Sequence, residues 1–140
     1  MSRNEEIVAE ARGWLGTRWV HQGRNRQGID CVGLLVMVAR NLEIADYDYT
    51  DYPRRPDGTF IQHFAKVLKP LSLDEAGDGD VLIFAQGGHA CHCGIRATRH
   101  GRPSIIHSHA RRKAVIEEDL KQAVESVGVV VRAFGFPGDD

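Results

Sequence analysis

A cysteine stands where a glycine-containing loop meets an apolar segment, in Gly28-Ile29-Asp30-Cys31-Val32-Gly33-Leu34-Leu35. Asp30 is a good N-cap residue, because its carboxylate can accept the unpaired N–H groups of a first helical turn. Cys31 is then expected in that turn, where free N–H groups and the positive end of the helix dipole favour a thiolate. Since a thiolate is the nucleophile of covalent catalysis, Cys31 is a candidate catalytic residue. The alternative is a small buried hydrophobic residue, because free cysteines are often buried.

A nucleophilic cysteine needs a base, and the base needs a group that orients it. His92 and His107 are candidates, since each lies in a predicted strand of the second half of the chain. If the two strands pair, the imidazoles can approach within hydrogen-bond range, and a helix packed on that sheet would place Cys31 beside His92. This arrangement recurs in papain-like enzymes. His109 is a rival to His107 because it shares the same strand face, and each histidine could instead be a structural or surface residue.

Metal binding is the competing chemistry. His89, Cys91 and Cys93 are expected on one face of a strand, and histidine and cysteine are zinc ligands. No second cluster of such residues completes a tetrahedral set, so we predict no metal and no cofactor. Cys91 and Cys93 are better interpreted as strand residues with reduced thiols, since Cα atoms about 6.6 Å apart are at the limit for a disulfide.

The positioning elements follow from hydrophobic periodicity. It predicts an amphipathic helix from Asn4, as its cap, to Leu15, a helix from Cys31 to Leu42, and a short helix before Pro70. Residues 43–58 are expected to form a long irregular loop. The second half predicts a short helix at 118–124 and strands at 80–84, 89–97, 104–108, 114–116 and 127–134. Helices followed by a mostly antiparallel meander indicate the α+β class, with N-terminal helices packed on a small sheet.

Length and composition narrow the classes of protein. The chain has 140 residues, which fits one domain over residues 1–140, with 42% hydrophobic residues and a formal net charge of −1. This balance gives no global attraction to nucleic acid, although short arginine-rich stretches could meet an anionic polymer. No apolar run approaches the roughly 20 residues of a membrane span. The first six residues lack the hydrophobic region of a signal peptide, so we expect synthesis in the cytoplasm without one.

Several segments, in order, resemble motifs of the NlpC/P60 family of cysteine peptidases, and more closely its small phage-associated members. The family's Gly-Thr-Pro-Tyr-x-Trp-Gly-Gly and Asp-Cys-Ser-Gly-Leu-Val segments correspond to residues 16–23 and 30–35. Its Gly-Asp-Leu-hydrophobic-Phe strand, its His-Val-Gly-Ile strand and its hydrophobic-His motif match residues 79–84, 92–95 and 105–107. The His-Gln-Gly-Arg segment at 21–24 and the tail at 132–137 are similar to the phage-type variant.

The resemblance implies a papain-like α+β fold with Cys31 as nucleophile, His92 as base and His107 as the residue that orients His92. Substrates of the family are typically cell-wall peptides, often cut at a γ-D-glutamyl–diaminopimelate link. We therefore expect a cysteine peptidase or amidase whose partner is a peptidoglycan peptide. Association with phage tail proteins, in a virion tail or after release to the cell wall, is expected from the phage-type segments.

Two departures from the family pattern affect the expected site. Trp19 replaces the tyrosine whose hydroxyl lies near the nucleophile, and tryptophan offers only an N–H donor and more bulk. Val32 replaces the serine after the cysteine, although a backbone N–H can still serve an oxyanion. These changes leave open a catalytically inactive assembly module of a phage tail, or a thiol acyl-transfer enzyme.

Substrate binding is expected to involve residues around the cysteine motif, namely Trp19, His21, Arg24 and Asp30. Arg24, Arg26 or Arg54 could hold a substrate carboxylate through two parallel hydrogen bonds.

Overall fold

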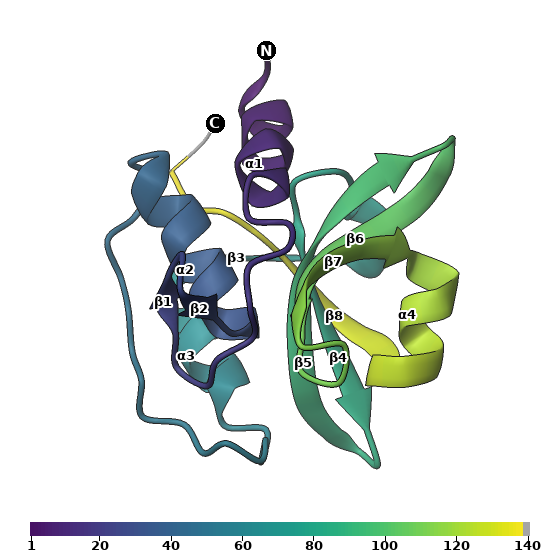
Figure 1. Cartoon of the computed structure of the whole chain (residues 1–140). Helices are drawn as coiled ribbons and strands as arrows, with labels where there is room; N and C mark the ends of the chain where they lie inside the picture. Colours follow the sequence, from purple (N-terminus) through teal and green to yellow (C-terminus); the bar gives the residue numbers. More distant parts are fainter. Residues whose placement is uncertain (139–140) are drawn as a thin grey trace.

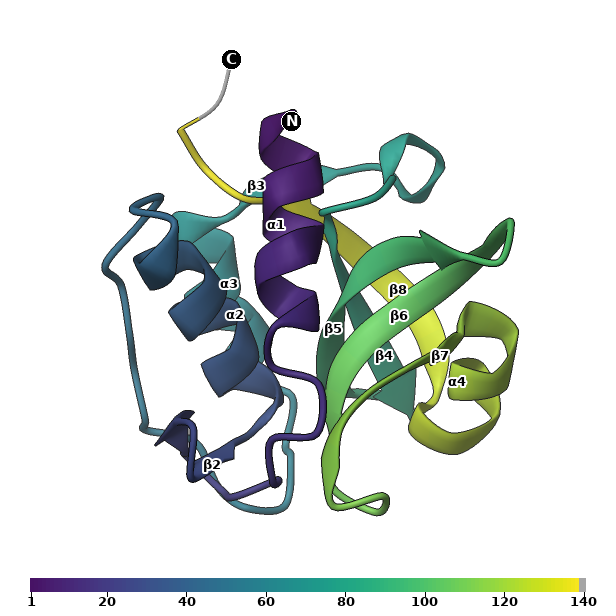
Figure 2. The ribbon, with the colours of Figure 1, turned by 45° about the horizontal axis from the view of Figure 1, so that its top comes forward.

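One six-stranded antiparallel sheet with helices on both sides forms the fold of the computed structural model, which describes residues 1–138. The sheet order is β3-β8-β4-β5-β6-β7, and a separate hairpin joins β1 to β2. The helices α1, α2 and α3 lie on one side of the sheet and α4 lies on the other (Figures 1 and 2). The predicted α+β class, with helices packed on an antiparallel sheet, is confirmed. The elements are α1 (Arg3–Arg12), β1 (Arg24–Asn25), β2 (Gly28–Ile29), α2 (Cys31–Asn41), α3 (Phe60–Val67), β3 (Lys69–Leu71), a 3-10 turn (Leu73–Glu75), β4 (Val81–Gln86), β5 (His89–Arg99), β6 (Arg102–His109), β7 (Ala114–Asp119), α4 (Leu120–Val127) and β8 (Val129–Gly135).

The central strand β4 is buried on both faces. Val81 and Ile83 pack into the main core with α1 and α2, whereas Leu82 and Phe84 pack into a second cluster beneath α4. A strand covered on both sides reads as a continuous apolar run rather than an alternating one. This double burial explains why the sequence at 81–84 carries no polar residue.

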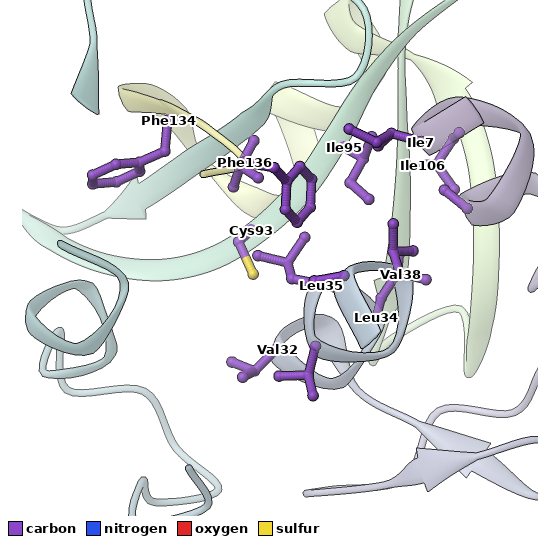
Figure 3. Packing of buried hydrophobic residues seen from close by; sticks show 14 of the residues in the cluster. Ile7, Val32, Leu34, Leu35, Val38, Cys93, Ile95, Ile106, Phe134 and Phe136 are labelled. Carbon is purple, nitrogen blue, oxygen red and sulfur yellow. The ribbon is translucent and has the colours of Figure 1, made fainter. Parts of the chain in front are cut away.

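The helix α2 is held in place by its apolar residues. Leu34 and Val38 are fully buried, and Figure 3 shows Leu35 of the same helix beside Cys93 of β5. Full burial of one such side chain stabilises a fold by roughly 1.5–3 kcal/mol. This packing fixes the position of Cys31, the first residue of α2, relative to the sheet.

The prediction that Asn4 caps the first helix was wrong, because the helix begins at Arg3 and its N-cap is Ser2, two residues before Asn4. The Ser2 hydroxyl accepts the Glu5 N–H at 3.1 Å, and the Glu5 carboxylate accepts the Ser2 N–H at 2.8 Å. This reciprocal pair is a capping box, which satisfies two unpaired donors at once. The helix ends at Arg12, while Trp14 beyond it remains buried.

The last third of the chain differs from the prediction at the boundary between strand and helix. Strand β7 continues to Asp119 because Glu118 and Asp119 pair with Ile105 and Ser104 of β6. The following helix α4 therefore begins at Leu120 rather than at Glu118. Residues 43–58 contain no helix or strand, as predicted.

The predicted common face of His89, Cys91 and Cys93 does not exist. Phe84 pairs with His92 while Ala85 pairs with Ala90, so Cys91 has no partner on β4 and forms a β-bulge. The Cys91 thiol donates to the Val127 carbonyl of α4 at 3.3 Å, whereas Cys93 faces α2 (Figure 3). Within residues 1–138, no group of three or more histidine, cysteine or acidic residues is arranged to hold a metal ion.

All three cysteines are free thiols. None of the helices among residues 1–138 has the length and apolar character needed to cross a membrane.

Candidate active site

Asp30 caps the helix that begins at Cys31, as the sequence predicts. Its Oδ1 accepts the Gly33 N–H at 2.8 Å, and its Oδ2 accepts the Gln22 N–H at 2.7 Å. Asp30 is only 3% exposed, so these bonds form in a largely dry environment. The Cys31 backbone N–H has no acceptor within the described part of the chain, which leaves it available at the helix N-terminus.

Arg24 binds the other side of the Asp30 carboxylate. Its Nη1 lies 3.1 Å from Asp30 Oδ1, and its Nε donates to Asp48. Its Nη2 donates to the Tyr49 carbonyl and to the Tyr52 hydroxyl, each at 3.0 Å. The guanidinium therefore ties the cap of α2 to the long loop at 43–58, and its donors are used within the protein.

Tyr52 links this loop to the cap. Its hydroxyl donates to Asp30 Oδ2 at 2.7 Å, and its ring lies edge-on to His21 with centroids 5.6 Å apart. Burial, followed by the negative charge of Asp30, raises the pKa of Tyr52 well above its ordinary value. The phenol is thus a neutral hydrogen-bond donor at physiological pH.

The two candidate histidines are hydrogen-bonded to each other. His92 Nε2 lies 2.7 Å from His107 Nδ1, and both rings are buried. Burial, followed by the neighbouring His107 and His109, lowers the pKa of His92 well below its ordinary value. A neutral imidazole can accept a proton, which is the state that a general base requires. The expected approach of the two rings is therefore observed.

Gly94 permits this approach. A Cβ at this position would lie 2.8 Å from the Ile105 side chain and 3.0 Å from the His107 Cβ, both on the neighbouring strand. The strands could not carry His107 so close to His92 with a larger residue at 94. The glycine of the His92-Cys93-Gly94-Ile95 segment thus has a packing role in the site.

A fourth residue, which the sequence reasoning placed in a helix, completes this row. Glu118 Oε2 lies 2.8 Å from His107 Nε2. Its position on β7 is diagonal to His107, which pairs directly with Ile116. Knowledge of the register between β6 and β7 would have identified Glu118 as a neighbour of His107. Ile116 is opposite His107, and in a strand Glu118 lies on the same face as Ile116.

His109 has different neighbours from His107. Its Nδ1 accepts the Arg112 N–H at 3.2 Å, and its Nε2 lies 3.1 Å from the Ser126 hydroxyl of α4. Both ring nitrogens are therefore engaged away from the His92 ring. The structure brings His107, rather than its rival His109, into contact with His92.

A cavity joins the cysteine to the base. Cys31 and His92 both line it. Burial raises the pKa of the Cys93 thiol, which packs beneath Cys31 in the core, well above its ordinary value. The other lining residues come from the 19–32 segment, the loop at 52–60 and the sheet, namely Trp19, His21, Asp30, Val32, Tyr52, Pro53, Arg54, Pro56, Asp57, Thr59, Phe60, Cys91, Ser108 and Ala110.

The predicted binding residues fall into two groups. Trp19, His21 and Asp30 line the cavity, whereas Arg24 lies behind it among its protein partners. Arg54 lines the cavity with its guanidinium 5.3 Å from the centre of the Trp19 ring. Their roles toward a substrate stay predictions, and among the three arginines considered from the sequence only Arg54 borders the cavity.

A cysteine at a helix N-terminus, facing a sheet that carries a histidine pair, defines the papain-like α+β class of folds. The family comparison then identifies the chain more closely, because the NlpC/P60 family matches residues 16–131. The protein belongs to the NlpC/P60 family.

Solved structures agree with this fold. The NlpC/p60 domain of the peptidoglycan hydrolase SagA has a TM-score of 0.67 and 21% identity, covering 96% of this chain and 100% of that one. NlpC2 from Trichomonas vaginalis has a TM-score of 0.72 and 16% identity over 99% of this chain, which spans 48% of the NlpC2 chain. An N-acetylmuramoyl-L-alanine amidase from Bacteroides uniformis has a TM-score of 0.68 and 12% identity, covering 96% of this chain and 99% of that one. No curated protein sequence matches the chain.

Proposed function

We propose that the protein is a cysteine peptidase that hydrolyses amide bonds in the peptides of bacterial peptidoglycan. The observation that carries the proposal is the 2.7 Å contact between His92 Nε2 and His107 Nδ1, beside a cavity that Cys31 shares. Membership of the NlpC/P60 family supports the same reaction class, since SagA is described as a peptidoglycan hydrolase.

The proposed reaction passes through a thioester. Cys31 gives its proton to His92, and the thiolate attacks the amide carbonyl carbon. The Cys31 backbone N–H donates to the oxyanion, an interaction worth roughly 3 kcal/mol in comparable sites. His92 then protonates the leaving amine as the C–N bond breaks. A water molecule, deprotonated by His92, attacks the thioester and releases the acid, and the sulfur recovers its proton.

We infer that the substrate carries carboxylates close to the scissile bond, as the γ-D-glutamyl–diaminopimelate link does. Arg54 supports this, because its guanidinium borders the cavity and lies over the face of the Trp19 ring. A guanidinium can bind a carboxylate through two parallel hydrogen bonds. Trp19 then holds the arginine in place rather than supplying a hydroxyl.

The test is mass spectrometry of purified peptidoglycan peptides digested in ¹⁸O-labelled water. Hydrolysis at the proposed link gives a new amine on diaminopimelate and one ¹⁸O atom in the new glutamyl carboxyl group. An unlabelled amide with an added amine acceptor would instead identify acyl transfer. Absence of any product over a panel of peptidoglycan types would favour the inactive assembly module.

We further propose that the protein acts as part of a phage or prophage tail. The support is the similarity of residues 21–24 and 132–137 to the phage-type family pattern. Quantitative mass spectrometry of purified virions is expected to find the protein at a constant number of copies per particle. Its absence from virions of a lysate that contains it would contradict this location.

A further inference from the structure

Glu118 is the end of a row of polar contacts that starts at the candidate base. His92 Nε2 meets His107 Nδ1 at 2.7 Å, and His107 Nε2 meets Glu118 Oε2 at 2.8 Å. The row crosses three neighbouring strands, β5, β6 and β7. His107 is fully buried and the Glu118 side chain is 14% exposed, so little solvent competes for these bonds.

The directions of the two bonds follow from what each group can donate. The hydrogen bond from His107 is the largest cause that lowers the pKa of Glu118, so this residue is a carboxylate at neutral pH and can only accept. His107 must then carry a proton on Nε2. In a neutral imidazole the other nitrogen, Nδ1, is an acceptor, so His92 must carry its proton on Nε2. This leaves His92 Nδ1 as the free, basic nitrogen of the pair.

We propose that Glu118 is a positioning residue that sets the tautomers of both His107 and His92, and thereby makes His92 Nδ1 the base for Cys31. The inference rests on the proposed cysteine-hydrolase function. Glu118 acts through His107 and touches neither Cys31 nor the cavity. In a serine triad, the carboxylate does the same for a single histidine.

The neighbouring acidic residue shows what a purely structural role looks like. Glu117 is on the opposite face of β7, where its carboxylate binds Arg12 at 2.9 Å and the Ser104 hydroxyl at 2.8 Å. Among the described residues Glu118 forms no such ion pair with arginine or lysine, and its carboxylate is hydrogen-bonded to His107. Glu117 is therefore a matched control of the same residue type on the same strand.

The charged and titratable groups around the row are few. His92 on β5 faces His107 and His109 of β6, and Glu118 on β7 faces both of these residues and Arg112. The α4 residue in contact with this group is Ser126, which carries no charge. Glu118 is therefore the carboxylate of this cluster. Without its negative charge, the binding of an additional proton by the histidine pair becomes less favourable.

The first experiment is independent of activity. Long-range ¹H–¹⁵N NMR spectra of the ¹⁵N-labelled protein distinguish the two neutral tautomers and the imidazolium of each histidine. In the wild type and in Glu117→Gln, we expect His107 and His92 as neutral rings protonated at Nε2. In Glu118→Gln, we expect a mixture of tautomers at both rings. Nδ1-protonated His92 or a doubly protonated His107 in the wild type, or unchanged tautomers in Glu118→Gln, would overturn the proposal.

The second experiment measures kinetics on a peptidoglycan peptide. Glu118→Gln is expected to lower kcat about tenfold and to leave KM unchanged. Losses of about this size are typical when a residue that orients a metal-binding histidine is replaced. The acidic limb of the pH profile is expected to move to lower pH, because protonated His92, which cannot act as a base, loses the stabilising negative charge of Glu118. Glu118→Asp should recover part of the loss, while Glu117→Gln should leave the profile in place even where it lowers stability. A stable Glu118→Gln variant with wild-type kcat and pH profile would refute the inference.

The two hypotheses fail in different ways. If the wild type hydrolyses no peptide but the tautomers respond to Glu118→Gln as expected, the proposed function fails and the positioning role of Glu118 stands as a property of the histidine pair. If the wild type is active and the tautomers do not respond, the positioning role fails and the proposed function stands.

Discussion

Two substitutions of Asp30 distinguish the contribution of the helix cap to stability from that of the hydrogen-bond network around the carboxylate. The buried carboxylate accepts bonds from Gly33 and Arg24 at Oδ1 and from Gln22 and Tyr52 at Oδ2. In Asp30→Asn the remaining oxygen can still cap the helix, but the new amide NH₂ faces two donors. Two bonds to a charged acceptor are lost, at about 1.5 kcal/mol each. We therefore expect the free energy of unfolding to fall by about 3 kcal/mol.

Asp30→Ala removes the cap as well, which costs about 1 kcal/mol more, and leaves Arg24 with Asp48 as its carboxylate partner. The assay is guanidinium unfolding at pH 7 followed by circular dichroism, with linear extrapolation to water. Asp46→Asn is the control, because its ion pair with Arg40 is exposed and worth less than about 1 kcal/mol. Equal stability of the wild type and Asp30→Asn, or a loss below about 1 kcal/mol in Asp30→Ala, would refute this assignment of the network.

Three further results are expected. Iodoacetamide should label Cys31, which borders the cavity, faster than Cys91 or Cys93, because burial raises the pKa of both other thiols; faster labelling of either would contradict the site. Burial lowers the pKa of His92 below 6.5, so in mild acid the unfolded chain binds a proton that the folded site excludes. The free energy of unfolding should therefore fall as the pH drops below about 6.5, and it should fall less steeply in His92→Gln. The same pH dependence in both proteins would be inconsistent with this. His92→Ala should lower kcat by about 10²–10⁴ and His107→Ala by less, and the reverse order would show that the two roles are exchanged.

The fold could be predicted from the sequence where local signals and burial agree. The helix at Cys31 has a cap at Asp30, an apolar face and no competing signal, and it forms from Cys31 to Asn41. His92 and His107 were expected to approach each other if their two predicted strands, separated by a turn, paired, and the two strands do pair. These features depend on short-range chemistry that the sequence states directly.

The remaining features depend on register and on long loops. The bulge at Cys91 shifts the strand faces by one residue, and nothing near it in the sequence marks the extra position. The sequence predicts a helix at Glu118, whereas the residue lies in a strand. Its pairing with Ile105 of β6 is a tertiary contact, which local sequence signals do not reveal. Tyr52 reaches Asp30 from the middle of a loop without secondary structure, a contact that local propensity cannot predict.

The measurement that tests the central claim most directly is the rate of peptide release from peptidoglycan by Cys31→Ala, with Cys93→Ala as the matched thiol control. The account predicts that Cys31→Ala loses about 10⁴-fold or more of the rate, as comparable nucleophile substitutions do, while remaining folded. Cys93→Ala should keep the activity, because its thiol is not part of the proposed reaction. Cys31→Ala with a rate close to that of the wild type would contradict the assignment of Cys31 as the nucleophile.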